Sequence, residues 1–315
     1  MSQIKTLLDR RTLTLLLAFA GIKLLLHLGI NLWSGYEIFR DELYYLACAD
    51  RLAWGYVDQP PLSIALLAAV RGVIGDSLFA LRLLPAIAGA ALVFVTGLLA
   101  RMMGGGRFAI SLAAIASIVA GEVLAVSSIW SMNIFDLLLV ALAMVWLIRL
   151  IDTEDPRYWI ALGLTLGLGL LNKVGVLWVG LGVVAAIVAS PLRRWLATPW
   201  PWVSGGVSVL VFLPYVLWNA THDWAHLEFI ERAVSGKYSG LDAWTFLSGQ
   251  ILHQNPSTLL LWLSGLTWLL FAPGGRKYRP LGVIWVTACV VLIANGQSKA
   301  SYLASTYAML FAAGF

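Results

Sequence analysis

The chain has 315 residues, of which 60% are hydrophobic and only 12% charged, and its mean hydropathy is +0.85. A soluble domain carries roughly 25% charged residues, so this composition excludes an ordinary soluble protein. The formal net charge of +5 does not indicate nucleic-acid binding, because the Lys and Arg residues gather in short connections, as the positive-inside rule expects.

Ten apolar segments follow one another along the chain. They lie at 12–33, 77–100, 107–121, 131–150, 158–172, 174–190, 201–219, 256–273, 280–295 and 300–315. Several exceed the roughly 18 apolar residues that mark a membrane-spanning helix. The sequence therefore predicts an all-α fold, a polytopic helical bundle with about ten transmembrane helices in one domain over residues 1–315. The first segment is too long for a signal-peptide core and lacks an A-x-A cleavage site, which favours a retained span.

Charge predicts the topology of this bundle. If the N-terminus is cytoplasmic, the inner connections hold Lys5, Arg10, Arg11, Arg101, Arg107, Arg149, Arg157, Arg193, Arg194, Arg276, Lys277 and Arg279. The outer connections hold fewer cations over much more sequence. This alternation predicts a multi-pass protein of a cell inner membrane, with two long outer loops at about 34–76 and 220–255.

The first outer loop contains two predicted interfacial helices. The stretch EIFRDELYYLACADRLAWGY has helical spacing of its apolar and aromatic residues, and the pair Pro60-Pro61 ends it. The following SIALLAAVRGVIG forms the second short helix.

Two acidic features of this loop could carry chemistry. Asp41 and Glu42 follow the first span, where acidic residues can simply complement the positive end of a helix dipole. Alternatively, a carboxylate at the membrane boundary could act as a general base. Asp58 lies just before the two prolines, which restrict the backbone. The prolines either hold Asp58 in a defined position for chemistry or simply form a rigid turn between the two helices.

Three further residues lie near the outer boundary. Asp136 is an ionisable group inside a span, which is expensive and indicates function unless it is a solvated boundary residue or a partner of Asn133. Lys173 and Lys299 interrupt apolar runs. Each is either a snorkelling lysine or a cation for a lipid phosphate.

Metal binding has weak support. His222 and His226 have the spacing of two ligands on one helix face, but no third ligand stands at a known spacing. Cys48 and Cys289 form no metal or disulfide pattern. We therefore predict no cofactor firmly, although a divalent metal is possible, and the metal ligands stay unknown.

The run FRDELYYLACADRLAWGYVDQPPL resembles the first outer loop of GT-C membrane glycosyltransferases of the protein O-mannosyltransferase and aminoarabinose transferase type. The resemblance continues in order through SMNIFDLLL, LGLGLLNKVGVLWVG, LEFIERA, LSGQILHQNP and SKASYLASTYAMLFAAG. It implies inverting transfer of a sugar from a polyprenyl-phosphate donor, which lies among membrane lipids, to an acceptor protein, lipid or glycan on the outer, periplasmic face.

The resemblance also implies roles for particular residues. Asp41 takes the position of the general base, and Lys173 and Lys299 take those of lysines that contact the donor phosphate. The remaining residues that it places in the substrate cavity are Glu42, Asp58, Asp136 and Tyr302. The pair Asp58-Gln59 departs from relatives that have Glu-Lys or Asp-His, which puts donor-phosphate and metal contacts at this turn in doubt.

Other classes of function stay open at this stage. A lipid or sugar transporter would place polar sites near the bilayer midplane and often shows inverted repeats, neither of which is visible in the sequence. A third hypothesis is that the protein is a non-catalytic membrane scaffold. It gains support because the chain ends inside an apolar run, from which we expect the C-terminal part of the family domain to be absent.

Overall fold

The computed structural model describes residues 9–33, 35–236 and 240–315, and all regular structure within these ranges is helical. The α-helices are α2 (Arg10–Trp33), α3 (Arg40–Ala49), α4 (Leu62–Ile74), α5 (Leu78–Met102), α6 (Arg107–Val119), α7 (Gly121–Val126), α8 (Met132–Thr153), α9 (Arg157–Asn172), α10 (Val176–Val188), α11 (Trp200–Ala220), α12 (Ala225–Gly236), α13 (Ala243–His253), α14 (Leu259–Phe271), α15 (Arg279–Asn295) and α16 (Tyr307–Ala313). The 3-10 helices are η1 (Pro191–Ala197), η2 (Pro256–Thr258), η3 (Arg276–Tyr278) and η4 (Ala300–Thr306).

The chain is a multi-pass membrane protein. In the described ranges five helices are long and apolar enough to cross a bilayer, namely α2, α5, α8, α11 and α15 with η3. A sixth candidate is α10 with η1, which are bent by 94°. Each of the ten predicted segments contains a helix, and Lys173 lies between α9 and α10, as the predicted segments 158–172 and 174–190 imply. The remaining helices are too short for the count of ten spans to follow from length alone.

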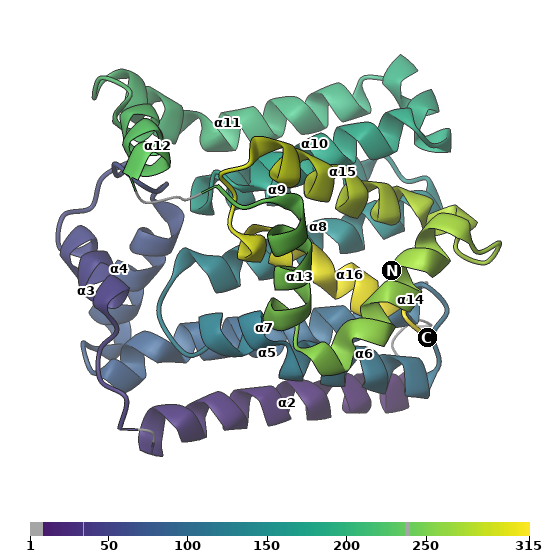
Figure 1. Cartoon of the computed structure of the whole chain (residues 1–315), viewed down its shortest axis with the longest axis horizontal. Helices are drawn as coiled ribbons and strands as arrows, with labels where there is room; N and C mark the ends of the chain where they lie inside the picture. Colours follow the sequence, from purple (N-terminus) through teal and green to yellow (C-terminus); the bar gives the residue numbers. More distant parts are fainter. Residues whose placement is uncertain (1–8, 34, 237–239) are drawn as a thin grey trace.

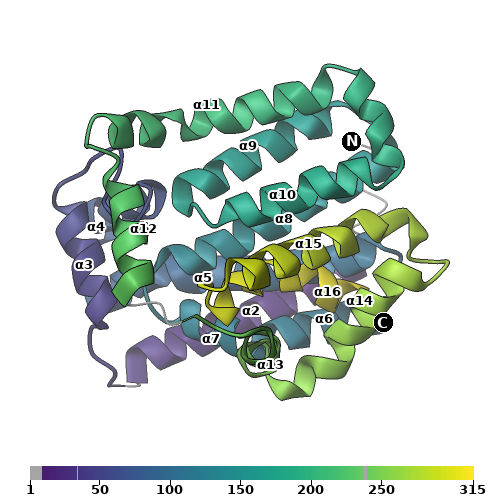
Figure 2. The same ribbon diagram turned by 45° about the horizontal axis from the view of Figure 1, so that its top comes forward.

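The spans stack side by side in one layered bundle (Figures 1 and 2). Helix α11 packs on α9, α9 on α8, α8 on α5, and α5 on α2. A second set covers one side of this stack, with α10 against α15, α14 against α16, and α16 against α5 and α6. Small residues permit the close contacts. A Cβ at Gly163 would lie 2.3 Å from the Ser204 carbonyl oxygen, and one at Gly265 would lie 2.0 Å from that of Leu310.

The connections separate into two ends of the bundle. Helices α3, α4 and α12 gather at one end, on the left in both views, and we call this the α3 end (Figures 1 and 2). At the opposite end Lys277 Nζ lies 2.7 Å from Asp152 Oδ1, and Arg194 pairs with Glu154. These cations come from connections that the charge pattern assigned to one side, and which side of the membrane that is stays a prediction.

Two local predictions differ from the structure. Helix α3 ends at Ala49 rather than continuing through Tyr56, because the Tyr56 hydroxyl turns back and donates to the Cys48 carbonyl at 3.1 Å. The last segment is not one helix, since η4 covers its first half and α16 its second. Both are buried against protein, which favours a tight 3-10 turn over a regular span.

Candidate functional site

Asp41 lies in the first turn of α3, at the α3 end of the bundle. Its side chain is 54% exposed, and Arg40 Nε lies 3.2 Å from its Oδ1. The Arg40 side chain is 83% exposed, and an ion pair so open to solvent is worth little. Asp41 is therefore a carboxylate that a ligand can reach, and no residue in the described ranges forms a strong pair with it.

Glu42, the next residue, is buried and fully engaged. Its carboxylate accepts from Arg82 Nε at 3.1 Å and Arg82 Nη2 at 2.7 Å. It also accepts from the Trp130 amide at 2.8 Å and from the Phe39 amide at 2.9 Å, the latter closing a capping box at the start of α3. Because four protein donors occupy its two oxygens, Glu42 is suited to orienting α3, and its predicted contact with substrate stays a prediction.

Arg82 extends this anchor into the segment before α3. Its Nη1 donates to the Tyr36 carbonyl at 3.1 Å and its Nη2 to the Glu37 carbonyl at 2.9 Å. The guanidinium lies on α5 and is 3% exposed, so the pair with Glu42 joins the first loop to a membrane span. No local pattern in the sequence marks Arg82 for this role, because it lies 40 residues from Glu42 along the chain.

Tyr45 gives α3 a second attachment. The Met132 amide donates to the Tyr45 hydroxyl at 3.1 Å. Since the Trp130 amide holds Glu42, residues 130–132 bind α3 at two points one turn apart. Burial raises the pKa of Tyr45, so its hydroxyl stays protonated at any physiological pH. Together these contacts fix the helix that presents Asp41.

Asp58 lies beside the same face of α3. Its Oδ1 accepts from the Tyr44 hydroxyl at 2.6 Å, and Tyr44 stands one helical turn after Asp41. Burial and then the hydrogen bond with Asp58 raise the pKa of Tyr44. The turn itself is closed by the Tyr56 amide, which donates to the Gln59 carbonyl at 3.1 Å, and Gln59 is buried. The prolines therefore brace a turn that brings Asp58 next to α3.

Lys173 and Asp136 form a second buried pair. Lys173 Nζ lies 3.2 Å from Asp136 Oδ2 and 2.9 Å from Asn133 Oδ1. It also lies 5.4 Å from the centre of the Tyr302 ring, a cation–π distance. The exposed fractions are 13% for the Lys173 side chain and 5% for that of Asp136. Residues from α8, from the α9–α10 break and from η4 thus meet in one cluster.

The α3 anchor and this cluster share the start of α8. Asn172, beside Lys173, donates through Nδ2 to the Met132 carbonyl at 2.8 Å, while the Met132 amide holds Tyr45. Lys299 is exposed and caps η4, where its carbonyl accepts from the Tyr302 amide at 3.0 Å. Six of the seven predicted site residues are linked in this way through α3 or α8, and Lys299 adjoins them through η4.

The second loop contacts the first at His226. His226 Nδ1 lies 3.1 Å from the Val57 carbonyl oxygen, and His222 Nδ1 lies 2.7 Å from that of Trp218. The His222 ring also stacks on Trp218 with centroids 4.2 Å apart. Burial lowers the pKa of His226. In the described ranges no three His, Cys, Asp or Glu side chains group as metal ligands.

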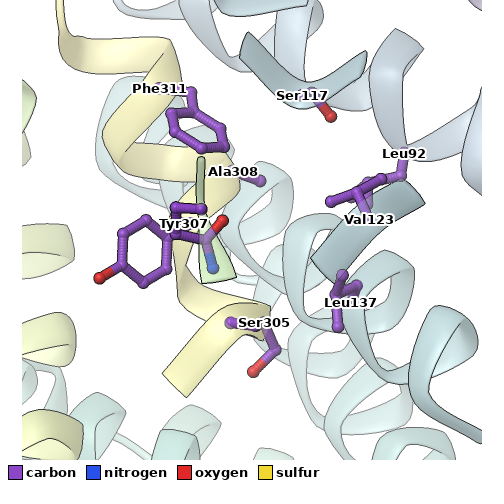
Figure 3. A pocket seen from close by; sticks show the side chains of 10 residues that line it. Leu92, Ser117, Val123, Leu137, Ser305, Tyr307, Ala308 and Phe311 are labelled. Atoms are coloured by element: carbon purple, nitrogen blue, oxygen red, sulfur yellow. The ribbon is translucent and has the colours of Figure 1, made fainter. Parts of the chain in front are cut away.

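An interior cavity lies behind η4 (Figure 3). It is lined by Leu92, Ser117, Val123, Leu137, Gln254, Ala304, Ser305, Tyr307, Ala308 and Phe311. It has room for a water molecule but not for a sugar.

Residues 58–218, just over half of the chain, match the family described as dolichyl-phosphate-mannose-protein mannosyltransferase. The lipid A galacturonosyltransferase RgtD of Rhizobium johnstonii is 26% identical over 208 residues, which are 64% of this chain and 44% of that protein. The chain thus spans less than half the length of this curated relative.

Solved structures share the fold. ArnT of Cupriavidus metallidurans, bound to undecaprenyl phosphate, aligns with a TM-score of 0.75 at 16% identity over 96% of this chain and 59% of ArnT. The oligosaccharyltransferase of Archaeoglobus fulgidus aligns with a TM-score of 0.63 at 14% identity, over 97% of this chain and 49% of its own. The family match and this shared GT-C fold show that the chain belongs to the dolichyl-phosphate-mannose-protein mannosyltransferase family.

Proposed function

We propose that the protein is a glycosyltransferase that moves a sugar from a polyprenyl-phosphate donor to an acceptor hydroxyl, with inversion at the anomeric carbon. The observation that carries the proposal is the reachable carboxylate of Asp41 on a helix that the buried Glu42–Arg82 pair holds in place. Catalytic groups need such fixed geometry, because small displacements cost large factors in rate. The donor class is supported by the ArnT structure, whose bound ligand is undecaprenyl phosphate.

Asp41 acts as the general base in this proposal. Its carboxylate takes the proton of the acceptor hydroxyl as that oxygen attacks the anomeric carbon. The bond between the anomeric carbon and the phosphate oxygen breaks, and its electron pair leaves with the polyprenyl phosphate. Asp58 and Tyr44 lie next to this position and are suited to hydrogen bonding with sugar hydroxyls.

The leaving phosphate gains negative charge, which fixed cations can stabilise. Lys173 is the best candidate, since Asp136, Asn133 and Tyr302 hold its ammonium near the start of α8. Lys299 supplies a second, exposed cation on the neighbouring η4. Glu42 then acts mainly by positioning α3, and Asp136 by positioning Lys173. The lipid chain of the donor would lie along the apolar surface of the spans.

The α3 end faces the periplasm in this proposal, and the membrane is a cell inner membrane. The cations at the opposite end support this orientation, because Lys and Arg are enriched on the cytoplasmic side. Labelling of single cysteines at Ser239 and Lys277 from opposite faces of sealed vesicles tests it, and labelling from the same face would contradict it.

The function is tested with purified protein in proteoliposomes. The donors are undecaprenyl-phosphate-linked mannose, aminoarabinose and galacturonic acid, each radiolabelled, with lipid A and a Ser/Thr-rich peptide as acceptors. We expect one donor to give a product whose anomeric configuration, measured by NMR, is opposite to that of the donor. A product of retained configuration, or translocation of labelled donor without transfer, would contradict the proposal.

A further inference from the structure

The protein-facing side of α2 carries three polar residues, Lys23, His27 and Asn31, spaced by four. This spacing puts them one above another along the helix. Lys23 and His27 are both 0% exposed, although α2 and α11 are the two candidate spans with the smallest buried share. Ionisable groups buried in a membrane span are costly and indicate a function. None of the three belongs to the site described above.

The two ring nitrogens of His27 have different surroundings. Ser128 Oγ lies 2.9 Å from the Leu124 carbonyl oxygen and 3.2 Å from His27 Nδ1. When Ser128 donates its hydrogen to the nearer Leu124 carbonyl, Nδ1–H donates to Ser128, and the other ring nitrogen, Nε2, is an acceptor. It is buried and lacks a hydrogen-bond partner in the part of the chain that the structure describes.

The neighbours of His27 on the same helix face offer the complementary groups. Among the described residues, Lys23 Nζ makes one long hydrogen bond, 3.4 Å to the Ile118 carbonyl near the end of α6, which leaves donor capacity within that part of the chain. Both Asn31 side-chain atoms, Nδ2 and Oδ1, are buried without a partner among the described residues. At Gly89 of α5 a Cβ would lie 2.4 Å from Ser127 Oγ and 3.5 Å from Lys23 Cε, so α5 packs closely here.

We propose that this face of α2 is a binding site for a chain of buried water molecules that runs from Lys23 past His27 to Asn31. A water next to the ammonium accepts from Lys23 and donates to His27 Nε2, and a further water serves both atoms of Asn31. An anion would fit less well, because His27 Nε2 and Asn31 Oδ1 need donors. Buried polar groups without a protein partner are usually satisfied by such ordered water.

The waters support the segment that anchors α3. Lys23 contacts the end of α6 and His27 contacts Ser128, so α2 holds both ends of α7. Ser128 stands two residues before Trp130, whose amide binds Glu42. The water chain thus lies beneath the attachment of the helix that carries Asp41.

The sign of a change in thermal stability distinguishes a hydrated column from a dry one. We expect Asn31→Leu to lower the apparent Tm in nanodiscs by about 2–4 °C, because the water loses its partners. In a dry column the same change removes an unsatisfied amide and raises the Tm, which would overturn the proposal. Ile22→Leu, at the lipid-facing side of α2, is the matched control and leaves the Tm unchanged.

His27 offers an independent pair of variants. His27→Gln keeps a carbonyl acceptor for the water and should lose less stability than His27→Leu, whereas equal losses would contradict a bound water at Nε2. A cryo-EM map of the wild type that resolves ordered water gives the direct readout. Density within hydrogen-bond distance of His27 Nε2 and Asn31 supports the proposal, and an empty column in that map overturns it.

Discussion

Removing the charge of Glu42 should uncouple α3 from the bundle. In Glu42→Gln an amide NH2 group replaces one carboxylate oxygen. If it replaces Oε1, it faces the N–H groups of Arg82 and Trp130, and if it replaces Oε2, it faces those of Arg82 and Phe39. Either way two donors lose their acceptor. Breaking a buried ion pair on one side typically costs about 3–5 kcal/mol. At roughly 2–4 °C per kcal/mol for a protein of comparable size, the apparent Tm should fall by about 6–20 °C.

The double variant Glu42→Leu/Arg82→Met separates stability from positioning. Replacing a buried pair by apolar residues of similar volume is often neutral or stabilising, so we expect the Tm to recover much of the loss. Transfer should stay reduced by about a hundredfold, because α3 has lost its bond to the Trp130 amide.

The assay combines thermal unfolding in detergent with transfer from the polyprenyl-phosphate donor. Asp50→Asn is the control, since Asp50 caps the same helix at its other end and is largely exposed. Full transfer by the double variant, or wild-type stability of Glu42→Gln, would refute the positioning role of the pair.

Two further predictions concern charged pairs elsewhere. Lys173→Met should destabilise the fold by about 3–5 kcal/mol because it leaves Asp136 buried and unpaired. Adding Asp136→Leu should restore stability but not transfer, and recovery of transfer would argue against Lys173 as the phosphate cation. The hydrogen bond to Glu122 raises the pKa of His253. A raised pKa means that this stabilisation is complete below pH about 6.5 and is lost as pH rises through the raised value. As pH rises through the raised pKa of His253, the Tm of the wild type should therefore fall by more than the Tm of His253→Gln. Equal dependence of the two Tm values on pH would contradict a stabilising bond between His253 and Glu122.

Much of the bundle could be predicted from local sequence. Apolar runs marked the helices, Lys173 marked the break between α9 and α10, and the charge pattern separated the two ends. These features depend on neighbours along the chain, which is why hydropathy and the positive-inside rule capture them. The extent of α3 was overestimated, because the turn at Tyr56 overrides the helical spacing that follows Ala49.

The partners within the site could not be predicted in the same way. Glu42 is separated by 40 residues from Arg82 and by 88 from Trp130, and Lys173 by 37 from Asp136. Such pairs depend on how the spans pack, and no local pattern records them. The Trp130 contribution comes from a backbone amide, which every residue other than proline possesses, so its side chain carried no signal.

The role of Asp41 as the base is tested most directly by Asp41→Asn, which keeps the shape of the side chain and removes its basicity. Turnover and donor affinity are measured separately, with Asp50→Asn as the control. We expect a loss of transfer of at least about a hundredfold, the lower range for general-base catalysis, with little change in donor binding. Transfer at the wild-type rate by Asp41→Asn would contradict the account.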